Sequence, residues 1–343
     1  MTIPTLTTRP ISILIPVFNE AEGLRELFGA LPGVLDKLTT DWKVIFIDDG
    51  SSDTTLPMIR TQAERDARFT AISFSRNFGK EIAIAAGLKY VTGDAAIIMD
   101  ADLQHPPEVL NAFVERWLEG FDIVYGQRID RRLENPLRRF FARSFYQIYN
   151  GLVDTDIPEG AGDFRLLDRK AVTAMNAIRE RSRFNKGLYS WIGFKSVGVP
   201  YTVAERKFGQ SKWKFRKLLS FAVDGITSFT TLPLRVWSLL GVLISTIAFA
   251  YAFIILLQTV LFGVDLPGYA SLIVSVMFFS GIQLISLGVL GQYIGRVYDE
   301  VKFRPLFVVA EEIGIDPSGG PNAAPRGEGT DRKTIASGHP NAG

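Results

Sequence analysis

The sequence predicts an α/β domain with a mainly parallel sheet, followed by two membrane helices toward the C-terminus. The domain is indicated by short apolar runs that alternate with helical patterns over residues 9–208, as is typical of strands and helices in alternation. The membrane helices are indicated by a long apolar stretch, in which Asp265 is the only charged residue between Val236 and Gly295. A buried helical hairpin of a soluble protein is the alternative, but such helices rarely lack a polar stripe.

The individual elements follow from the positions of the apolar runs. We expect strands at Ile11–Pro16, Val44–Asp48, Thr70–Ser75, Ala95–Asp100 and Asp122–Gly126. We expect helices at Glu20–Lys37, Asp53–Ala67, Lys80–Val91 and Pro106–Glu119. In sheets of this kind ligands bind at the carboxyl ends of the strands. The residues that directly follow each strand are therefore the candidate site residues.

Two segments near the C-terminus are long enough to cross a hydrocarbon core, which takes about 20 residues. They are Val236–Gln258 and Tyr269–Gln292, and the stretch Leu261–Gly268 reads as a short turn between them. Basic residues lie on both outer flanks and none lies in the turn, so the positive-inside rule predicts a multi-pass protein of the inner (plasma) membrane with cytoplasmic flanks. The basic residues are Lys212, Lys214, Arg216, Lys217 and Arg235 before the first span, and Arg296, Lys302 and Arg304 after the second.

These features divide the chain into parts with different environments. Residues 1–208 form the cytoplasmic domain, 209–235 are juxtamembrane amphipathic helices, 236–258 and 269–292 are the membrane helices, 293–314 are a cytoplasmic segment, and 315–343 are a disordered tail. A surface helix packed on the domain is the alternative for residues 209–235. Small residues along the second span also predict a face for close helix packing, and hence homo-oligomers. They are Gly281, Ser286, Gly288, Gly291 and Gly295.

Composition excludes several kinds of chemistry. The chain has no Cys and two His, which excludes disulfides, thiolate zinc sites and Cys nucleophiles and disfavours a Ser-His-Asp triad. A formal net charge of +2 gives no reason to expect nucleic-acid binding. The glycine-rich fingerprints of dinucleotide-binding and P-loop proteins are absent. Carboxylates, Arg, Lys and an oxygen-bound cation remain for the chemistry.

The sequence Asp100-Ala101-Asp102 carries the most specific chemical signal. Two carboxylates two residues apart, directly after an apolar strand, can share a hard divalent cation, and Gln104 can add an amide oxygen or a water contact. Mg²⁺ or Mn²⁺ held by few carboxylates also takes phosphate oxygens from a substrate. Together with nearby Arg and Lys residues, this site favours a nucleoside diphosphate as the ligand.

Six motifs in order resemble those of family 2 glycosyltransferases. They are P-V-F-N-E (16–20), D-D-G-S (48–51), S-R-N-F-G-K-E (75–81), D-A-D-L-Q-H-P-P-E (100–108), G-D-F-R-L-L-D-R (162–169) and E-R-K-F-G-Q-S-K (205–212). The chain is most similar to polyprenyl-phosphate glycosyltransferases of the bactoprenol glucosyltransferase and dolichol-phosphate mannose synthase type. The resemblance covers residues 10–304 and implies a GT-A-like, Rossmann-type nucleotide-sugar domain.

The resemblance assigns roles to residues of the donor site. The motifs that bind the nucleoside correspond to Pro16, Phe18, Glu20, Ile47 and Asp49. The residues that hold the metal ion and the diphosphate correspond to Asp100, Asp102 and Gln104, with Ala101 in the same turn. Lys80 and Arg128 are implied as further contacts to the nucleotide sugar, and Asp102, Arg128 and Asp163 are implied to act in catalysis.

The acceptor side rests on a basic segment and on one carboxylate. The resemblance matches Arg206, Gly209, Ser211 and Lys212 to one motif and implies that Arg206, Ser211 and Lys212 bind phosphate. A solvated or lipid-facing basic run is the alternative. In the family the counterpart of Asp163 is proposed as the catalytic base. However, a phosphate monoester has a second pKa near 6, so the acceptor is mostly dianionic at pH 7. We therefore expect Asp163 to orient the acceptor or the sugar, or to support the Arg165 region.

Together these residues predict an inverting, metal-dependent transfer of glucose from UDP-glucose to polyprenyl (undecaprenyl) phosphate at the cytoplasmic face. GDP-mannose and a UDP-linked modified pentose remain alternative donors. A processive polysaccharide synthase is disfavoured because the chain lacks a Gln-x-x-Arg-Trp motif. A non-catalytic membrane scaffold with a degenerate transferase domain is the alternative from another class.

Overall fold

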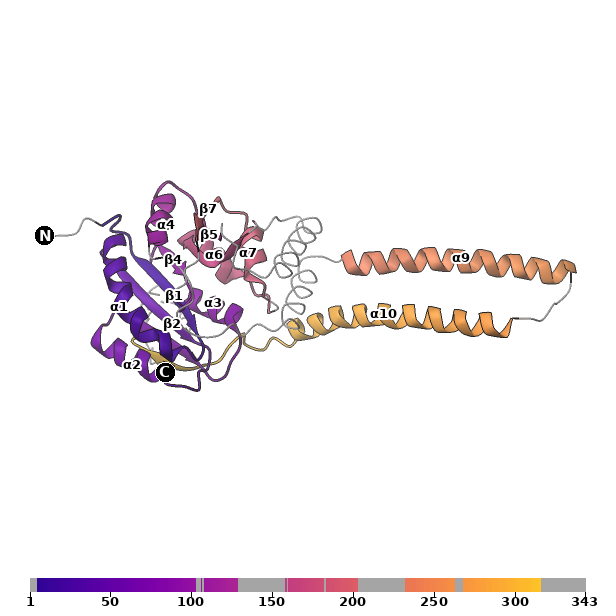
Figure 1. The fold of residues 1–343 in the computed structure, drawn as a ribbon, viewed down its shortest axis with the longest axis horizontal. Coiled ribbons are helices and arrows are strands. Elements are labelled where there is room, and N and C mark those ends of the chain that lie inside the picture. Colours follow the sequence, from indigo (N-terminus) through magenta and orange to yellow (C-terminus); the bar gives the residue numbers. More distant parts are fainter. Residues whose placement is uncertain are drawn as a thin grey trace, which may run out of the picture.

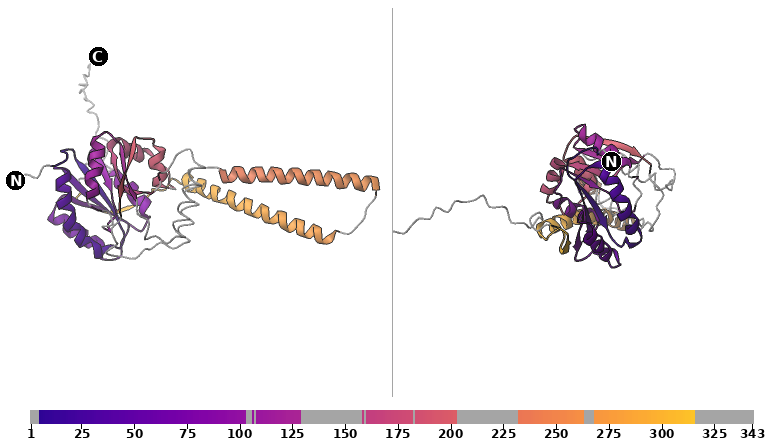
Figure 2. Two further views of the ribbon diagram at one scale, coloured as in Figure 1. Left: turned by 45° about the horizontal axis from the view of Figure 1, so that its top comes forward. Right: turned by 90° about the vertical axis from the view of Figure 1, so that its left-hand side faces the viewer.

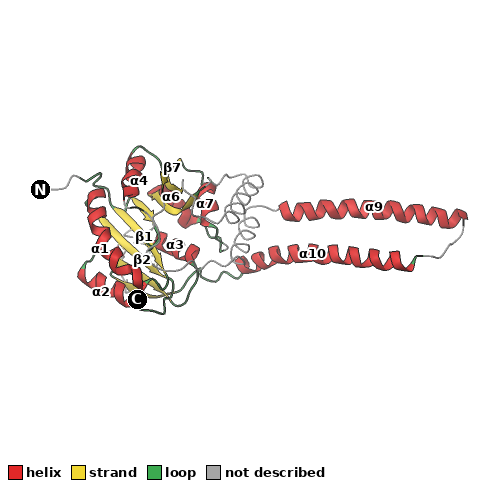
Figure 3. Cartoon of the chain, viewed as in Figure 1, coloured by secondary structure: helices red, strands yellow, loops and turns green. Residues whose placement is uncertain are grey.

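The computed structural model describes residues 5–102, 106, 108–128, 158, 160–181, 183–202, 232–262 and 268–315. Within these residues, helices cover both faces of an eight-stranded sheet, and two long helices extend side by side away from this domain (Figures 1 and 2). Figure 3 shows the same division into a mixed domain and a helical arm. The predicted α/β class is confirmed for the domain.

The sheet has the strand order β7-β5-β6-β4-β1-β2-β3-β8. Pairing is parallel for β1 with β2 and β4, for β2 with β3 and for β5 with β7, whereas β6 runs antiparallel to β4 and β5, and β8 antiparallel to β3. The strands are β1 (Ile11–Val17), β2 (Trp42–Asp48), β3 (Phe69–Phe74), β4 (Ala95–Ile98), β5 (Ile123–Arg128), β6 (Ala161–Asp168), β7 (Ser196–Tyr201) and β8 (Val309–Ile313). The sheet is thus mainly parallel, as predicted, and β6 to β8 were not predicted.

Two apolar layers hold the helices on the sheet. One layer joins the strands to α1, α2 and α4, and the other joins them to α3, α6 and α7. The strands in the middle are buried on both faces, which explains their nearly continuous apolar sequences. The helices of the domain are α1 (Ala21–Leu38), α2 (Thr55–Arg65), α3 (Lys80–Lys89), α4 (Glu108–Leu118), α6 (Arg169–Ala177) and α7 (Asn185–Trp191).

The helical arm consists of α9 (Leu232–Phe262) and α10 (Tyr269–Val301). Among the described residues, one helical stretch, Ser275–Val301, is long and apolar enough to cross a membrane, and α9 contains a shorter apolar stretch at Leu239–Ala248. By length and composition the structure therefore supports one of the two predicted spans. The two-span topology and the domain boundaries stay predictions.

The chain returns from α10 to the edge of the sheet, where β8 pairs with β3. Arg60 of α2 forms an ion pair with Glu311 at 2.7 Å, and the Tyr90 hydroxyl donates to Glu312 at 2.6 Å. The Phe307 ring stacks on Phe74 with 5.2 Å between ring centres. Part of the predicted cytoplasmic segment thus completes the sheet and ties the end of α10 to the domain.

Gly50 is the glycine whose replacement we expect to cost most in the domain. Its φ is +71°, and a Cβ built there would lie 2.6 Å from the Arg76 carbonyl carbon. Gly50→Ala should lower the free energy of unfolding by about 2 kcal/mol or more, because strain and a backbone clash add. Urea unfolding measures this. Gly29→Ala, in the open interior of α1, is the control and should be neutral or stabilising; equal effects of the two changes would contradict the expectation.

Candidate active site at the carboxyl edge of the sheet

The loops after β1 and β2 are joined by hydrogen bonds at the carboxyl edge of the sheet. The Asn19 N–H donates to Ser51 Oγ at 2.9 Å, and the Ser52 N–H donates to Asn19 Oδ1 at 2.8 Å. The Glu20 N–H donates to Thr55 Oγ1 at 3.0 Å. These bonds hold the predicted nucleoside-binding loops, which start at Phe18 and Asp49, in one fixed arrangement.

Asp49 joins the loop after β2 to the loop after β3. Its carboxylate accepts hydrogen bonds from the backbone N–H groups of Phe78 at 2.6 Å and Gly79 at 2.9 Å. Burial raises the pKa of Asp49 above its ordinary value, although these two bonds oppose the shift. The carboxylate therefore fixes the start of α3, and the predicted contact of Asp49 with a nucleoside stays a prediction.

Lys80, at the start of α3, brings two predicted site residues together. Its Nζ lies 2.6 Å from Asp100 Oδ1 and 3.1 Å from Asp163 Oδ2. Burial alone would lower the pKa of Lys80, but the two carboxylates raise it above its ordinary value, so the ammonium stays charged. A predicted metal ligand and a predicted catalytic residue thus share one cation.

Asp163 reaches this point because β6 runs antiparallel beside β4. The register pairs Ile98 with Arg165, and continuing it by two residues places Asp163 level with Asp100. Burial alone would raise the pKa of Asp163, but Lys80, Lys186 and Arg165 hold it below its ordinary value. Its second oxygen, Oδ1, is buried without a hydrogen-bond partner among the described residues. The carboxylate is therefore ionised, with one oxygen held by Lys80 and the other enclosed in the domain.

Asp100, Ala101 and Asp102 form the turn that follows β4. Ala101 is buried and anchors the turn in the core, which leaves the two carboxylates on partly exposed backbone. No group of three or more His, Cys, Asp or Glu side chains that could hold a metal ion occurs among the described residues, and Gln104 lies outside them. Two carboxylates fit Mg²⁺ or Mn²⁺ when a substrate diphosphate and water supply the other oxygens.

A buried polar cluster behind Asp163 was missed by the sequence analysis. Glu81 Oε2 accepts from the Asn185 N–H at 2.8 Å, and the Arg165 guanidinium lies 3.7 Å from the ring centre of Tyr189. Burial, with a further contribution from Asp163, raises the pKa of Glu81 to about 7. Within the described part of the chain, the Tyr189 hydroxyl and Asn185 Oδ1 are buried without hydrogen-bond partners. The sequence could have indicated Glu81, because it follows Lys80 in the motif of residues 75–81. No motif contains Asn185 or Tyr189.

Tyr201 is a second residue that the sequence analysis missed. It pairs with Arg128 in the register of β5 and β7. Burial raises the pKa of Tyr201 to about 12, with smaller contributions from the nearby carboxylates of Asp100 and Asp102. Its phenol therefore stays protonated and can donate a hydrogen bond beside the predicted metal ligands. Arg128 and Tyr201 bring the β5–β7 half of the sheet to the same site.

Of the other predicted residues, some belong to the described part of the chain and some lie outside it. Pro16 pairs with Ile47 across β1 and β2, and the Ile47 side chain is fully buried in the core, where it supports the edge from below. Phe18 and Glu20 are half-buried on the loop after β1. The predicted phosphate-binding residues Arg206, Ser211 and Lys212, with Gly209 of the same motif, lie outside the described residues.

Comparisons with known proteins show which family this chain is similar to. The family model described as glycosyl transferase family 2 matches residues 12–175. The glycosyltransferase sll0501 of Synechocystis sp. is 46% identical over 309 residues, which are 90% of this chain and 97% of that protein. Bactoprenol glucosyl transferase of Shigella phage SfV is 42% identical over 88% of this chain and 98% of its own. Among solved structures, the mannosyltransferase PcManGT of Pyrobaculum calidifontis, in complex with GDP-Man and Mn²⁺, matches with a TM-score of 0.43 and 19% identity over 61% of this chain and 60% of its own.

Proposed function

Because the chain belongs to glycosyl transferase family 2 and, within it, to the bactoprenol glycosyltransferases, we propose a specific reaction: it transfers glucose from UDP-glucose to undecaprenyl phosphate with inversion at the anomeric carbon. The observation that carries this proposal is the convergence of Asp100, Lys80 and Asp163 at the edge of the sheet. Relatives named bactoprenol glucosyl transferase, 42% identical over most of their length, support the acceptor and the sugar.

The donor and the acceptor meet at this edge in the proposed reaction. The phosphate oxygen of the lipid attacks the anomeric carbon while the bond to the nucleoside diphosphate breaks. Asp100 and Asp102 would hold Mg²⁺ or Mn²⁺, which supplies Lewis-acid stabilisation of the departing diphosphate. Lys80 adds a fixed positive charge between the carboxylates on the donor side and Asp163. The protonated phenol of Tyr201 can donate a hydrogen bond to an oxygen of the bound diphosphate.

The membrane placement follows from the acceptor. Undecaprenyl phosphate lies in a bilayer, and the apolar stretch Ser275–Val301 would anchor the domain beside it. We place the domain on the cytoplasmic side of the plasma membrane, with α9 as a second span and with Arg206 and Lys212 toward the lipid phosphate. Self-association through the small residues of α10 stays a prediction within this proposal.

The direct test is a synthesis assay with separate donors. Purified full-length protein is incubated with undecaprenyl phosphate, Mg²⁺ and either UDP-glucose, GDP-mannose or a UDP-linked pentose, and the lipid product is identified by mass. A hexose-containing glycolipid from UDP-glucose alone supports the proposal. A product from another donor would retain the reaction and correct the sugar, whereas nucleotide binding without any glycolipid would favour a scaffold.

Asp163→Asn tests whether Asp163 positions the acceptor or removes a proton. We expect a rate lower by about 10²-fold, because the substitution removes the charge that faces Lys80 and misplaces the acceptor. Both proteins should keep an acidic limb near pH 6, since the acceptor phosphate itself titrates there. Steady-state rates between pH 5 and pH 9 measure this. A limb that is present in the wild type and lost in the variant would assign the role of base to Asp163.

A further inference from the structure

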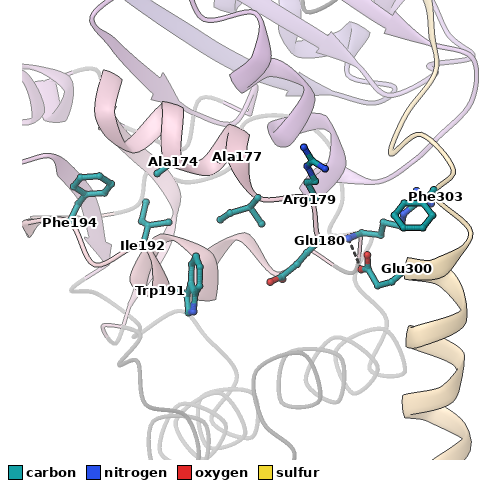
Figure 4. Close-up of a pocket in the computed structure, with 11 residues that line it drawn as sticks. Ala174, Ala177, Arg179, Glu180, Trp191, Ile192, Phe194, Glu300 and Phe303 are labelled. Atoms are coloured by element: carbon teal, nitrogen blue, oxygen red, sulfur yellow. Dashed lines mark hydrogen bonds between the residues drawn. The ribbon is translucent and has the colours of Figure 1, made fainter.

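A pocket of about 970 Å³ lies where the domain meets the end of α10 (Figure 4). Its floor is apolar and includes Ile178, Ile192 and Phe194, which follow α6 and α7. Those residues of the proposed transfer reaction that the structure describes do not line it. The pocket is therefore a separate feature, and the question is which ligand reaches it.

The end of α10 places the pocket at the depth of lipid headgroups, if Ser275–Val301 spans the membrane as in the proposed function. Charged residues begin at Arg296, and Glu300, which lines the pocket, lies four residues further on, or about 6 Å along the helix axis. The headgroup layer is about 5–8 Å thick on each side of the hydrocarbon core. Glu300 therefore falls within that layer.

Two aromatic side chains that line the pocket have large exposed fractions, which is unfavourable for apolar rings in water. Trp191 is 57% exposed and Phe303 is 83% exposed. In Figure 4, Trp191 and Glu180 extend in the direction in which α10 leaves the domain. Trp is enriched at membrane interfaces, where one side of the ring is apolar and its N–H is wet. The exposed aromatic residues thus match the depth inferred from α10.

The mouth of the pocket carries charges of both signs. Glu300 Oε1 accepts from the backbone N–H of Arg181 at 2.7 Å, and burial together with the nearby Glu300 charge raises the pKa of Glu180. Arg183 opposes that shift, and the guanidinium carbon of Arg181, which also lines the pocket, lies 5.9 Å from the ring centre of Phe303. An anionic headgroup would meet two carboxylates, and a purely cationic ligand would meet the arginines. The charge pattern therefore fits a zwitterion.

We propose that this pocket binds the headgroup of a zwitterionic phospholipid that carries a primary ammonium group. The ammonium group donates hydrogen bonds to the carboxylates of Glu180 and Glu300, and the phosphate faces Arg181. Upper acyl carbons lie against Trp191 and Phe303. A quaternary ammonium cannot donate these bonds, which distinguishes ethanolamine from choline headgroups. The proposal rests on the membrane placement in the proposed function.

Quenching of Trp191 fluorescence tests the proposal. Full-length protein is placed in phosphatidylcholine nanodiscs that contain a minor fraction of acyl-brominated phosphatidylethanolamine, phosphatidylcholine or phosphatidylglycerol. The contribution of Trp191 is the difference between the wild type and Trp191→Phe. We expect the brominated ethanolamine lipid to quench this contribution about threefold more than either other lipid, and Glu180→Gln to remove the preference.

The controls separate this inference from the proposed function. Glu119→Gln, an exposed carboxylate at the end of α4, should keep the preference. Equal quenching by all three lipids, no quenching by any, or a preference that survives a Glu180→Gln and Glu300→Gln double variant would each overturn the proposal. Glycolipid synthesis by the wild type in the same nanodiscs is measured separately, so loss of lipid preference with intact synthesis refutes only this inference, and loss of synthesis refutes the proposed function.

Discussion

Asp102→Asn is expected to lower kcat/KM for glycolipid formation by about 10³-fold or more, which is the scale of removing a group that stabilises charge in a transition state. Asp102 directly follows the buried Ala101, so the turn holds its backbone in place after the substitution. A neutral amide is a weaker ligand for a hard divalent cation, and a diphosphate would then lose most of its charge neutralisation. The effect should fall on chemistry and on donor binding together.

Two measurements distinguish this effect from a folding defect. The first is UDP-glucose binding with and without Mg²⁺: the wild type should bind more tightly with the ion, and Asp102→Asn should show little difference. The second is thermal unfolding, which should be nearly unchanged because Asp102 is only partly buried. Glu119→Gln, which removes an exposed carboxylate paired with Arg116, is the matched control and should retain full activity. Metal-dependent binding that persists in Asp102→Asn would remove this residue from the metal site.

The elements that position the donor side could be predicted from the sequence because their signals are local. All five predicted strands and four predicted helices are present, with ends shifted by a few residues; for example, β4 ends at Ile98 instead of Asp100. Apolar runs reveal strands that are buried on both faces, and the parallel crossover geometry then gathers their carboxyl ends. The proximity of the loops that start at Phe18 and Asp49 follows from this rule alone.

The contacts of Asp163 could not be predicted in the same way. They depend on β6 inserting antiparallel between β4 and β5, after a stretch of more than thirty residues without a predicted strand, and no local pattern encodes that pairing. Asn185 and Tyr189 come from a short helix with few amphipathic positions. β8 follows the long helical arm, so its pairing with β3 is set by tertiary packing. Long-range strand pairing is thus the information that the sequence analysis lacked.

Lys80→Met is expected to have the second large effect, because one ammonium serves two carboxylates. The substitution keeps an unbranched side chain of similar length and removes the charge between Asp100 and Asp163. We expect kcat to fall by about 10²-fold or more. The cost in unfolding free energy should be about 1–2 kcal/mol, smaller than for a fully buried pair, because the Lys80 side chain is 39% exposed.

The pKa of Asp163 determines the direction in which the pH profile of Lys80→Met should shift. Lys80 helps to hold the pKa of Asp163 below its ordinary value, so the wild-type carboxylate stays ionised until the pH falls through that lowered pKa. Without Lys80 the pKa of Asp163 rises, because burial and the nearby Asp100 charge both favour the protonated form. In Lys80→Met the activity and the stability that depend on the ionised Asp163 should therefore be lost at a higher pH than in the wild type.

Matched variants on the same helix separate charge from packing. Lys89→Met removes a lysine at the other end of α3, where Nζ lies 5.2 Å from the ring centre of Phe307, and it should leave the rate nearly unchanged. Lys80→Arg keeps the charge in a planar, bulkier group, so it should restore the acidic limb of the pH profile toward the wild type while recovering only part of kcat. If Lys80→Met kept both the wild-type rate and the wild-type limb, Lys80 would serve only to hold the fold, and the donor diphosphate would have to be neutralised by other groups.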